Sequence, residues 1–125
     1  MSVTTQGRHL ILELSGCDPE ILRDLSRVEP LMEQAAVATG ASIVGKVFHV
    51  NEIGGICGVV VVSESHLSIH TWPGRCYAAV DCYTCGTCDP EKAVDVIKEG
   101  LQAESCEVTR MTRGLSTLLC DGPCR

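Results

Sequence analysis

The amino-acid sequence predicts an α+β fold: a two-layer sandwich in which a mainly antiparallel sheet is covered on one face by two helices. Strand-like segments follow one another through the middle of the chain with only short links, which favours antiparallel hairpins. Stretches with helical periodicity flank that middle region. With 125 residues, 45% of them hydrophobic, the chain can enclose one core without disulfides or a structural metal.

Local sequence signals justify each element. The first helix should begin at Asp18, which can cap it, with Pro19 in its first turn, and Pro30 should divide it into a short turn and a longer helix. Four successive valines from Val59 favour a strand, because β-branched side chains lose rotamer freedom in a helix. A turn at Pro73 separates the next two strands. The expected elements are strands at residues 8–14, 41–50, 56–63, 66–71, 77–84 and 107–112, and helices at residues 21–39 and 89–101.

Composition argues against several classes of protein. The net charge of −6 and the pI near 5.1 leave no basic face for a nucleic acid or an anionic membrane surface. No signal segment opens the chain and no apolar run reaches membrane-spanning length, so a cytoplasmic protein is expected. A sheet covered on one face leaves the other face to be buried, which favours a homodimer. The domain should occupy residues 1–112, with a tail at residues 113–125.

Nine cysteines are many for a chain of this length. Their odd number and the absence of a signal segment favour reduced thiols over a disulfide framework. An iron–sulfur or zinc site at Cys82, Cys85 and Cys88 is disfavoured, because the first two are an odd number of positions apart and face opposite sides of a strand. In the tail, Cys120 and Cys124 could bind a metal or form a disulfide, but a disordered tail is the simpler expectation.

The densest polar cluster of the chain lies at residues 63–72, directly after the four valines. Alternation along a strand places His66, Ser68 and His70 on one face. By residue frequency alone, these would be solvated side chains of a half-exposed strand. A serine hydrolase triad has little support, because the chain lacks a G-x-S-x-G elbow.

Eight short segments, spread collinearly from Gly7 to about Leu101, carry a resemblance to a known family. They are GRHL at residues 7–10, GCD at 16–18, GAxxV at 40–44, VFH at 47–49, GVVV at 58–61, ESHLSIHTWP at 64–73, YAAVD at 77–81 and TCG at 84–86. Together they resemble the prokaryotic S-adenosylmethionine decarboxylase family. The run at residues 64–73 is highly specific by itself.

The resemblance implies that the chain cleaves itself between Glu64 and Ser65. The Ser65 hydroxyl attacks the Glu64 carbonyl to give an ester. A base, identified by the resemblance as His70, removes the Ser65 α-proton and so opens the ester; an imidazole suits this step because its pKa lies near neutrality. The serine remnant then hydrolyses to a pyruvoyl group. A β chain of residues 1–64 and an α chain that begins with the pyruvoyl group are expected.

The resemblance further implies a decarboxylase that uses this pyruvoyl group as its cofactor. The pyruvoyl ketone condenses with the substrate α-amine and accepts the electrons released as carbon dioxide leaves. The thiol of Cys85, in the TCG segment, is implied as the donor that returns a proton to the α-carbon. Without the resemblance, Cys85 would be interpreted as a buried apolar thiol.

The sequence departs from the family pattern at three positions. Cys57 stands where family members carry a serine that assists self-cleavage, and slower processing is expected because a thiol is a weak donor. Asn51 replaces an aromatic residue that stacks on adenine, and Gly74 replaces a glutamate whose carboxylate holds the ribose hydroxyls. Loss of stacking, worth about 1 kcal/mol, and of a charge-assisted hydrogen bond, worth about 1.5–3 kcal/mol, should weaken adenosyl binding by roughly two or more powers of ten.

These departures favour a changed small-molecule substrate. Relatives within the family decarboxylate L-arginine or L-ornithine, and the carboxylate of Glu52 could receive a guanidinium or ammonium group. A solvated loop residue is an equal interpretation of Glu52. The sequence therefore favours L-ornithine or L-arginine decarboxylation in polyamine biosynthesis, with S-adenosylmethionine decarboxylation for spermidine synthesis as the alternative. Two other classes stay open: a catalytically inactive partner subunit and a thiol-rich metal-binding protein.

Overall fold

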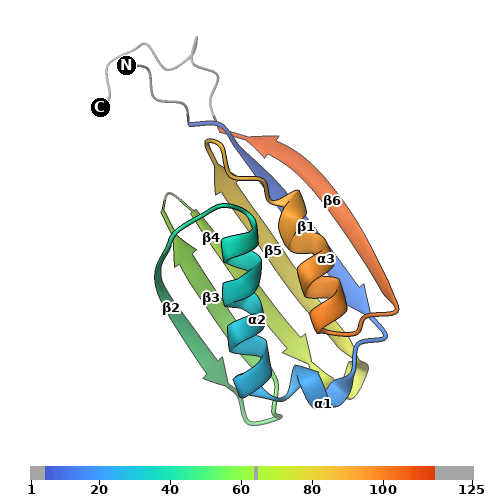
Figure 1. Ribbon diagram of the computed structural model, residues 1–125. Coiled ribbons are helices and arrows are strands. Elements are labelled where there is room, and N and C mark those ends of the chain that lie inside the picture. The colour runs from blue at the N-terminus through green and yellow to red at the C-terminus, as the bar shows by residue number, and fades with distance from the viewer. Residues whose placement is uncertain (1–4, 64, 115–125) are drawn as a thin grey trace, which may run out of the picture.

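A computed structural model describes residues 5–63 and 65–114, and six antiparallel strands form one sheet in the order β2-β3-β4-β5-β1-β6 (Figure 1). The predicted α+β class and the predicted order of elements are confirmed. The elements are β1 (Gly7–Ser15), α1 (Pro19–Leu22), α2 (Leu25–Ala38), β2 (Ile43–Val50), β3 (Ile56–Val62), β4 (Ser65–Trp72), the 3-10 helix η1 (Pro73–Arg75), β5 (Tyr77–Cys85), α3 (Glu91–Gly100) and β6 (Ser105–Arg113).

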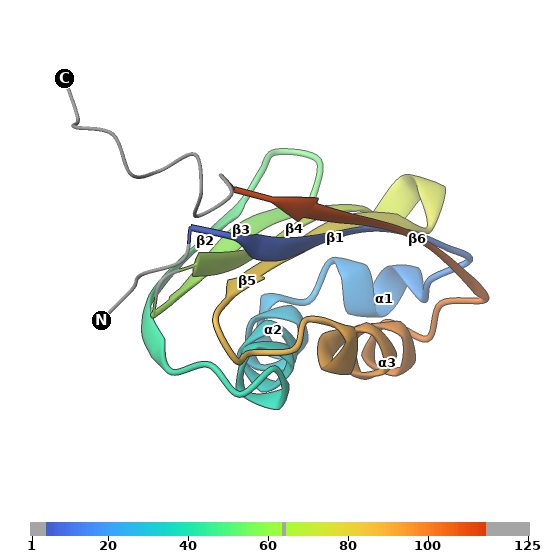
Figure 2. The ribbon, with the colours of Figure 1, turned by 90° about the horizontal axis from the view of Figure 1, so that it is seen from above.

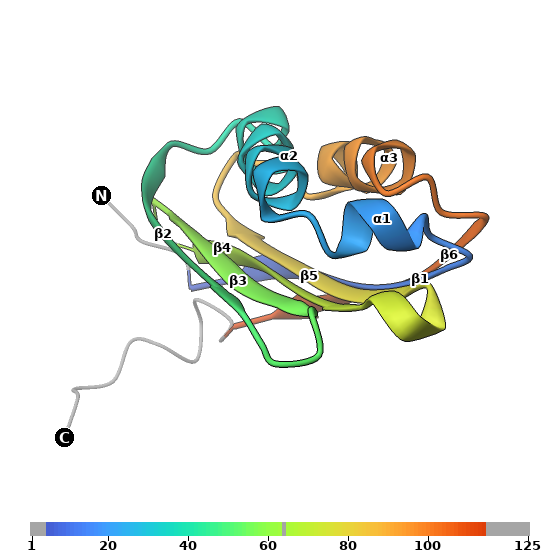
Figure 3. The same cartoon turned by 90° about the horizontal axis from the view of Figure 1, so that it is seen from below.

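The helices lie on one face of the sheet and leave the other face open (Figures 2 and 3). Alternate strand positions point toward the helices and are fully buried, as Leu67 and Ile69 of β4 show. They pack against apolar side chains such as Met32 of α2 and Ile97 of α3. The intervening strand positions face the open side, where most side chains are half-buried or exposed. The core therefore lies between sheet and helices, and the polar strand positions are presented on the opposite side.

The first helical stretch divides earlier than the sequence predicted. As expected, Asp18 caps α1, its carboxylate accepting a hydrogen bond of 2.9 Å from the Glu20 amide. The division, however, falls at Asp24, whose carboxylate caps α2 through a 3.0 Å bond from the Ser26 amide. The prediction that Pro30 divides the stretch is wrong. Pro30 lies inside α2, where its ring costs one backbone hydrogen bond.

No helix in the described part of the chain is long and apolar enough to cross a membrane.

Thr71 ties the sheet to the helix layer near the end of β4. Its side chain is buried, and its hydroxyl makes two hydrogen bonds of 2.8 Å. It accepts one from the Ile56 amide at the start of β3 and donates the other to the Leu22 carbonyl at the end of α1. One buried hydroxyl therefore satisfies two backbone groups on separate elements, which fixes the end of β4 against α1.

We predict that Thr71→Val lowers the free energy of unfolding by about 2–4 kcal/mol, because two buried backbone groups lose their partner while the side-chain shape is kept. Chemical denaturation of both proteins measures this difference. The matched control is Thr109→Val on the exposed edge strand β6, which should change stability by less than about 0.5 kcal/mol. Equal unfolding midpoints for the two variants would contradict the assigned role of Thr71.

Candidate active site

The predicted site residues fall into two groups at different places along β4. The first group, Ser65 and Cys85, lies where β4 begins and β5 ends. The second group, Cys57 and His70, lies further along β4 and on the neighbouring strand β3. Glu64, the other residue of the expected cleavage site, lies outside the described residues.

Ser65 opens β4 directly after the turn that joins it to β3. Its hydroxyl donates a hydrogen bond to the backbone carbonyl of Tyr83 on β5. The register pairs His66 with Tyr83, which sets Ser65 one position from Cys85. A Cβ at Gly7 would lie only 2.8 Å from the Tyr83 ring and 3.0 Å from Cys85 Sγ. Glycine at position 7 therefore leaves room around both side chains.

A chain of polar contacts crosses four strands of the open face beside this group. Arg113 Nη1 lies 3.3 Å from His9 Nδ1, His9 Nε2 lies 3.4 Å from Asp81 Oδ1, and Ser68 Oγ donates to Asp81 Oδ2 at 2.8 Å. Because a guanidinium only donates, His9 Nδ1 accepts, and the ring proton is on Nε2, facing Asp81. The Arg113 guanidinium also lies 4.6 Å from the centre of the Tyr83 ring. Tyr83, whose carbonyl holds the Ser65 hydroxyl, is thus fixed from the β6 side.

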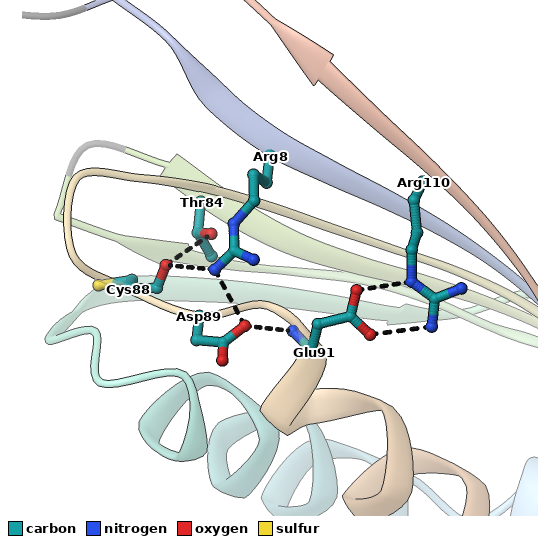
Figure 4. A network of polar contacts seen from close by, with 6 residues as sticks. All are labelled: Arg8, Thr84, Cys88, Asp89, Glu91 and Arg110. Carbon is teal, nitrogen blue, oxygen red and sulfur yellow. Dashed lines mark hydrogen bonds and ion pairs between the residues drawn. The ribbon is translucent and has the colours of Figure 1, made fainter.

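The segment after β5 is held by ion pairs to two other strands (Figure 4). Arg8 of β1 pairs with Asp89 at 3.0 Å and also reaches the Cys88 carbonyl at 3.5 Å. Asp89, just before α3, accepts a hydrogen bond from the Glu91 amide in the first turn of that helix at 3.0 Å. Arg110 of β6 binds both carboxylate oxygens of Glu91, at 2.6 and 2.9 Å, and these hydrogen bonds lower the pKa of Glu91. These contacts fix the backbone that leaves the end of β5.

The second group is a thiol and an imidazole on the open face. Cys57 and His70 are directly paired across β3 and β4, and Cys57 Sγ lies 3.6 Å from His70 Nε2. Both side chains are exposed. The His70 ring stacks on Trp72, with 5.9 Å between the ring centres. The thiol that replaces the family's serine is therefore still within contact distance of the imidazole.

The substrate-binding positions predicted from the sequence lie around the loop between β2 and β3. The Asn51 carboxamide accepts hydrogen bonds from the Ile53 and Gly55 amides at 3.1 and 2.9 Å, so it closes this loop. Glu52 is exposed at the tip of the loop. Gly74 lies across from the loop and lines a pocket of about 260 Å³. Of these three positions, only Gly74 borders the pocket.

The two groups cannot meet within one chain. Ser65 and His70 are five positions apart on the same strand, which corresponds to about 16 Å at the usual rise per residue. An odd separation also places their side chains on opposite faces of the sheet. The register of β4 with β3 and β5 therefore sets Ser65 at the strand end where Cys85 lies and His70 directly opposite Cys57, but leaves the two groups apart.

The cysteines differ in burial according to the face that they occupy. Cys82 is fully buried toward the helices, and burial raises its pKa to about 12. Its neighbour Cys85, three positions on, is half-buried and points the other way, as predicted. Within residues 5–63 and 65–114, no group of three or more His, Cys, Asp or Glu side chains could hold a metal ion. Cys120 and Cys124 lie outside the described residues.

We predict that iodoacetamide at pH 8 modifies Cys57 in the native protein and leaves Cys82 and Cys17 intact. Cys57 is exposed, whereas burial raises the pKa of Cys82 to about 12 and that of Cys17 to about 11. Peptide mass spectrometry measures the labelling at each position, and unfolding in guanidinium should make all three thiols react. Native labelling of Cys82 as fast as that of Cys57 would contradict the placement of Cys82 in the core.

The chain is similar in sequence and in structure to known proteins. The family model described as S-adenosylmethionine decarboxylase matches residues 8–114. The chain is 48% identical over 110 residues to the S-adenosylmethionine decarboxylase proenzyme of Caldanaerobacter subterraneus subsp. tengcongensis, covering 87% of this chain and 89% of that protein. For the proenzyme of Thermococcus gammatolerans the identity is 43% over 114 residues, covering 90% and 80%. The crystal structure of the adenosylmethionine decarboxylase of Aquifex aeolicus superimposes with a TM-score of 0.81 at 30% identity, covering 91% of this chain and 95% of that one.

Proposed function

Because this chain belongs to the S-adenosylmethionine decarboxylase family, whose members are self-processing, pyruvoyl-dependent decarboxylases, we propose that its substrate is S-adenosylmethionine. The observation that carries this proposal is the family match over residues 8–114. The expectation of L-ornithine or L-arginine as substrate gains no support from the relatives, which are named for S-adenosylmethionine. S-adenosylmethionine, the alternative substrate predicted from the sequence, is therefore better supported than L-ornithine or L-arginine.

Ser65 is the proposed source of the pyruvoyl group. Support comes from its position at the start of β4, where the Tyr83 carbonyl orients its hydroxyl, and from the space that Gly7 leaves beside Cys85. When bound, a pyruvoyl group supplies a ketone that accepts electrons as carbon dioxide leaves. The Cys85 thiol, next to that position, would hold the proton that is returned to the substrate carbon. A Cβ at Gly7 would come within 3.0 Å of Cys85 Sγ, so glycine at this position keeps space beside the thiol.

His70 and Cys57 are proposed to act in self-cleavage, and the distance along β4 supports the proposal that a second copy of the chain brings them to Ser65. A two-fold axis parallel to the sheets and perpendicular to β4 would pack two open faces together and set the His70 end of one copy against the Ser65 end of the other. The open face also carries exposed apolar side chains that such packing would bury, with exposed fractions of 68% for Val47, 42% for Val61 and 45% for Met111. These placements support the proposal of a homodimer with two shared sites.

We predict that the purified protein consists of two fragments, residues 1–64 and 65–125, and releases carbon dioxide from S-adenosylmethionine. Intact mass spectrometry and a carbon dioxide assay with S-adenosylmethionine, L-ornithine and L-arginine measure both properties. Ser65→Ala should leave one uncut, inactive chain, because the attacking hydroxyl is lost. A wild-type chain that stays uncut would indicate an inactive partner subunit, and release from L-ornithine or L-arginine alone would overturn the proposed substrate.

The shared site predicts a specific pattern of complementation. Ser65→Ala and His70→Ala should each stay uncut when expressed alone. When the two variants are co-expressed with different tags, the His70→Ala chain should be cut, because its Ser65 meets the intact His70 of the other copy, and the Ser65→Ala chain should stay whole. The matched control co-expresses the His70→Ala chain with the double variant and should give no cleavage. If the His70→Ala chain stays whole in the mixed sample, the site lies within one chain.

A further inference from the structure

The pocket near Gly74 lies between two segments that project on the open side of the sheet. One is the β2–β3 loop at residues 51–55, and the other is η1 (Figures 2 and 3). The pocket has a volume of about 260 Å³ and is lined by Ile53, Trp72, Pro73, Gly74 and Arg75. It adjoins the Cys57–His70 pair, because Trp72 stacks on His70.

The apolar wall of this pocket is held in place by aromatic contacts. Trp72 lies between His70 and Tyr77, with ring centres 5.9 and 5.3 Å away. The Tyr77 hydroxyl donates to Glu13 at 2.5 Å, and this hydrogen bond raises the pKa of Tyr77 to about 12, so the hydroxyl keeps its proton. The indole and the exposed Ile53 side chain together offer apolar surface for a planar ring.

Of the five residues that line the pocket, Arg75 alone has an ionisable side chain. Its side chain is exposed, and within residues 5–63 and 65–114 it has neither a hydrogen bond nor an ion pair. Glu52, the nearest acidic residue along the β2–β3 loop, does not line the pocket. At Gly74, where the family carries a carboxylate, an added Cβ would meet nothing within 4 Å. The charge in this pocket is therefore positive.

We propose that Arg75 is the specificity-determining residue of this pocket, binding the ribose hydroxyls of an adenosyl group in place of the carboxylate absent at Gly74. A guanidinium presents five N–H donors, and hydroxyl oxygens accept hydrogen bonds. Adenine and ribose are uncharged, whereas the side chains of ornithine and arginine carry a positive charge that Arg75 repels. This inference rests on the proposed function and assigns it a binding residue.

The test compares the matured wild type with Arg75→Ala and with the control Arg27→Ala, an exposed arginine on α2 in the helix layer. Isothermal titration with 5′-methylthioadenosine, which carries the adenosyl group without an amino acid, measures binding independently of catalysis. In Arg75→Ala we expect its Kd, and the KM for S-adenosylmethionine, to rise about 10- to 100-fold. The kcat and the extent of self-cleavage should not change, and Arg27→Ala should match the wild type.

A second variant identifies the contact. Gly74→Glu added to Arg75→Ala should recover part of the lost nucleoside affinity, because the space at Gly74 admits a side chain whose carboxylate can accept from the ribose hydroxyls. An unchanged Kd in Arg75→Ala would overturn the assignment of Arg75, even if the wild type decarboxylates S-adenosylmethionine. If the wild type does not act on S-adenosylmethionine but Arg75→Ala loses nucleoside binding, the proposed substrate fails and the assignment of Arg75 holds.

Discussion

The pairing of β4 with β3 on one side and β5 on the other is the constraint on which the site depends. This register places Ser65 and Cys85 at the same end of the β4–β5 pair and places His70 directly opposite Cys57. Alternation along the same strand sends Leu67 and Ile69 into the core. A shift by one residue would exchange the two faces, which would bury the polar positions and expose the core side chains. Burial of these apolar residues therefore also fixes the chemistry of the open face.

One-sided coverage of the sheet also separates the roles of the cysteines. Cys82 and Cys17 are buried, where desolvation raises the pKa of each thiol and keeps it protonated. Such thiols behave as small apolar side chains. Cys57 and Cys85 occupy strand positions that face away from the helices, and these are the two to which the family resemblance assigns chemistry. A high cysteine content is thus compatible with a small number of reacting thiols.

Much of the fold was predictable because its signals are local: the valine-rich strand after Val59, the turn at Pro73 and the cap at Asp18 each depend on adjacent residues. The break at Asp24 was missed because Pro30 was the stronger signal in the same stretch. The contacts that join Arg113, His9 and Asp81 could not be predicted, since they depend on the register of strands whose residues are 104 and 72 positions apart in sequence. The sequence motifs identified which residues belong to the site. Their division into two groups could be seen only from the pairing of the strands in the sheet.

The same sheet explains how a cut between residues 64 and 65 would leave the fold intact. After the proposed cut, β3 keeps its pairing with β2 and β4, and β4 keeps its pairing with β3 and β5. Thr71 also continues to bind β3 and α1 at the far end of β4. The proposed cut falls between the end of β3 at Val62 and the start of β4 at Ser65, outside both strands. A new chain end at position 65 would then be held by the strands at the same end of the sheet as Cys85, so a cofactor made from the chain would be fixed by the fold itself.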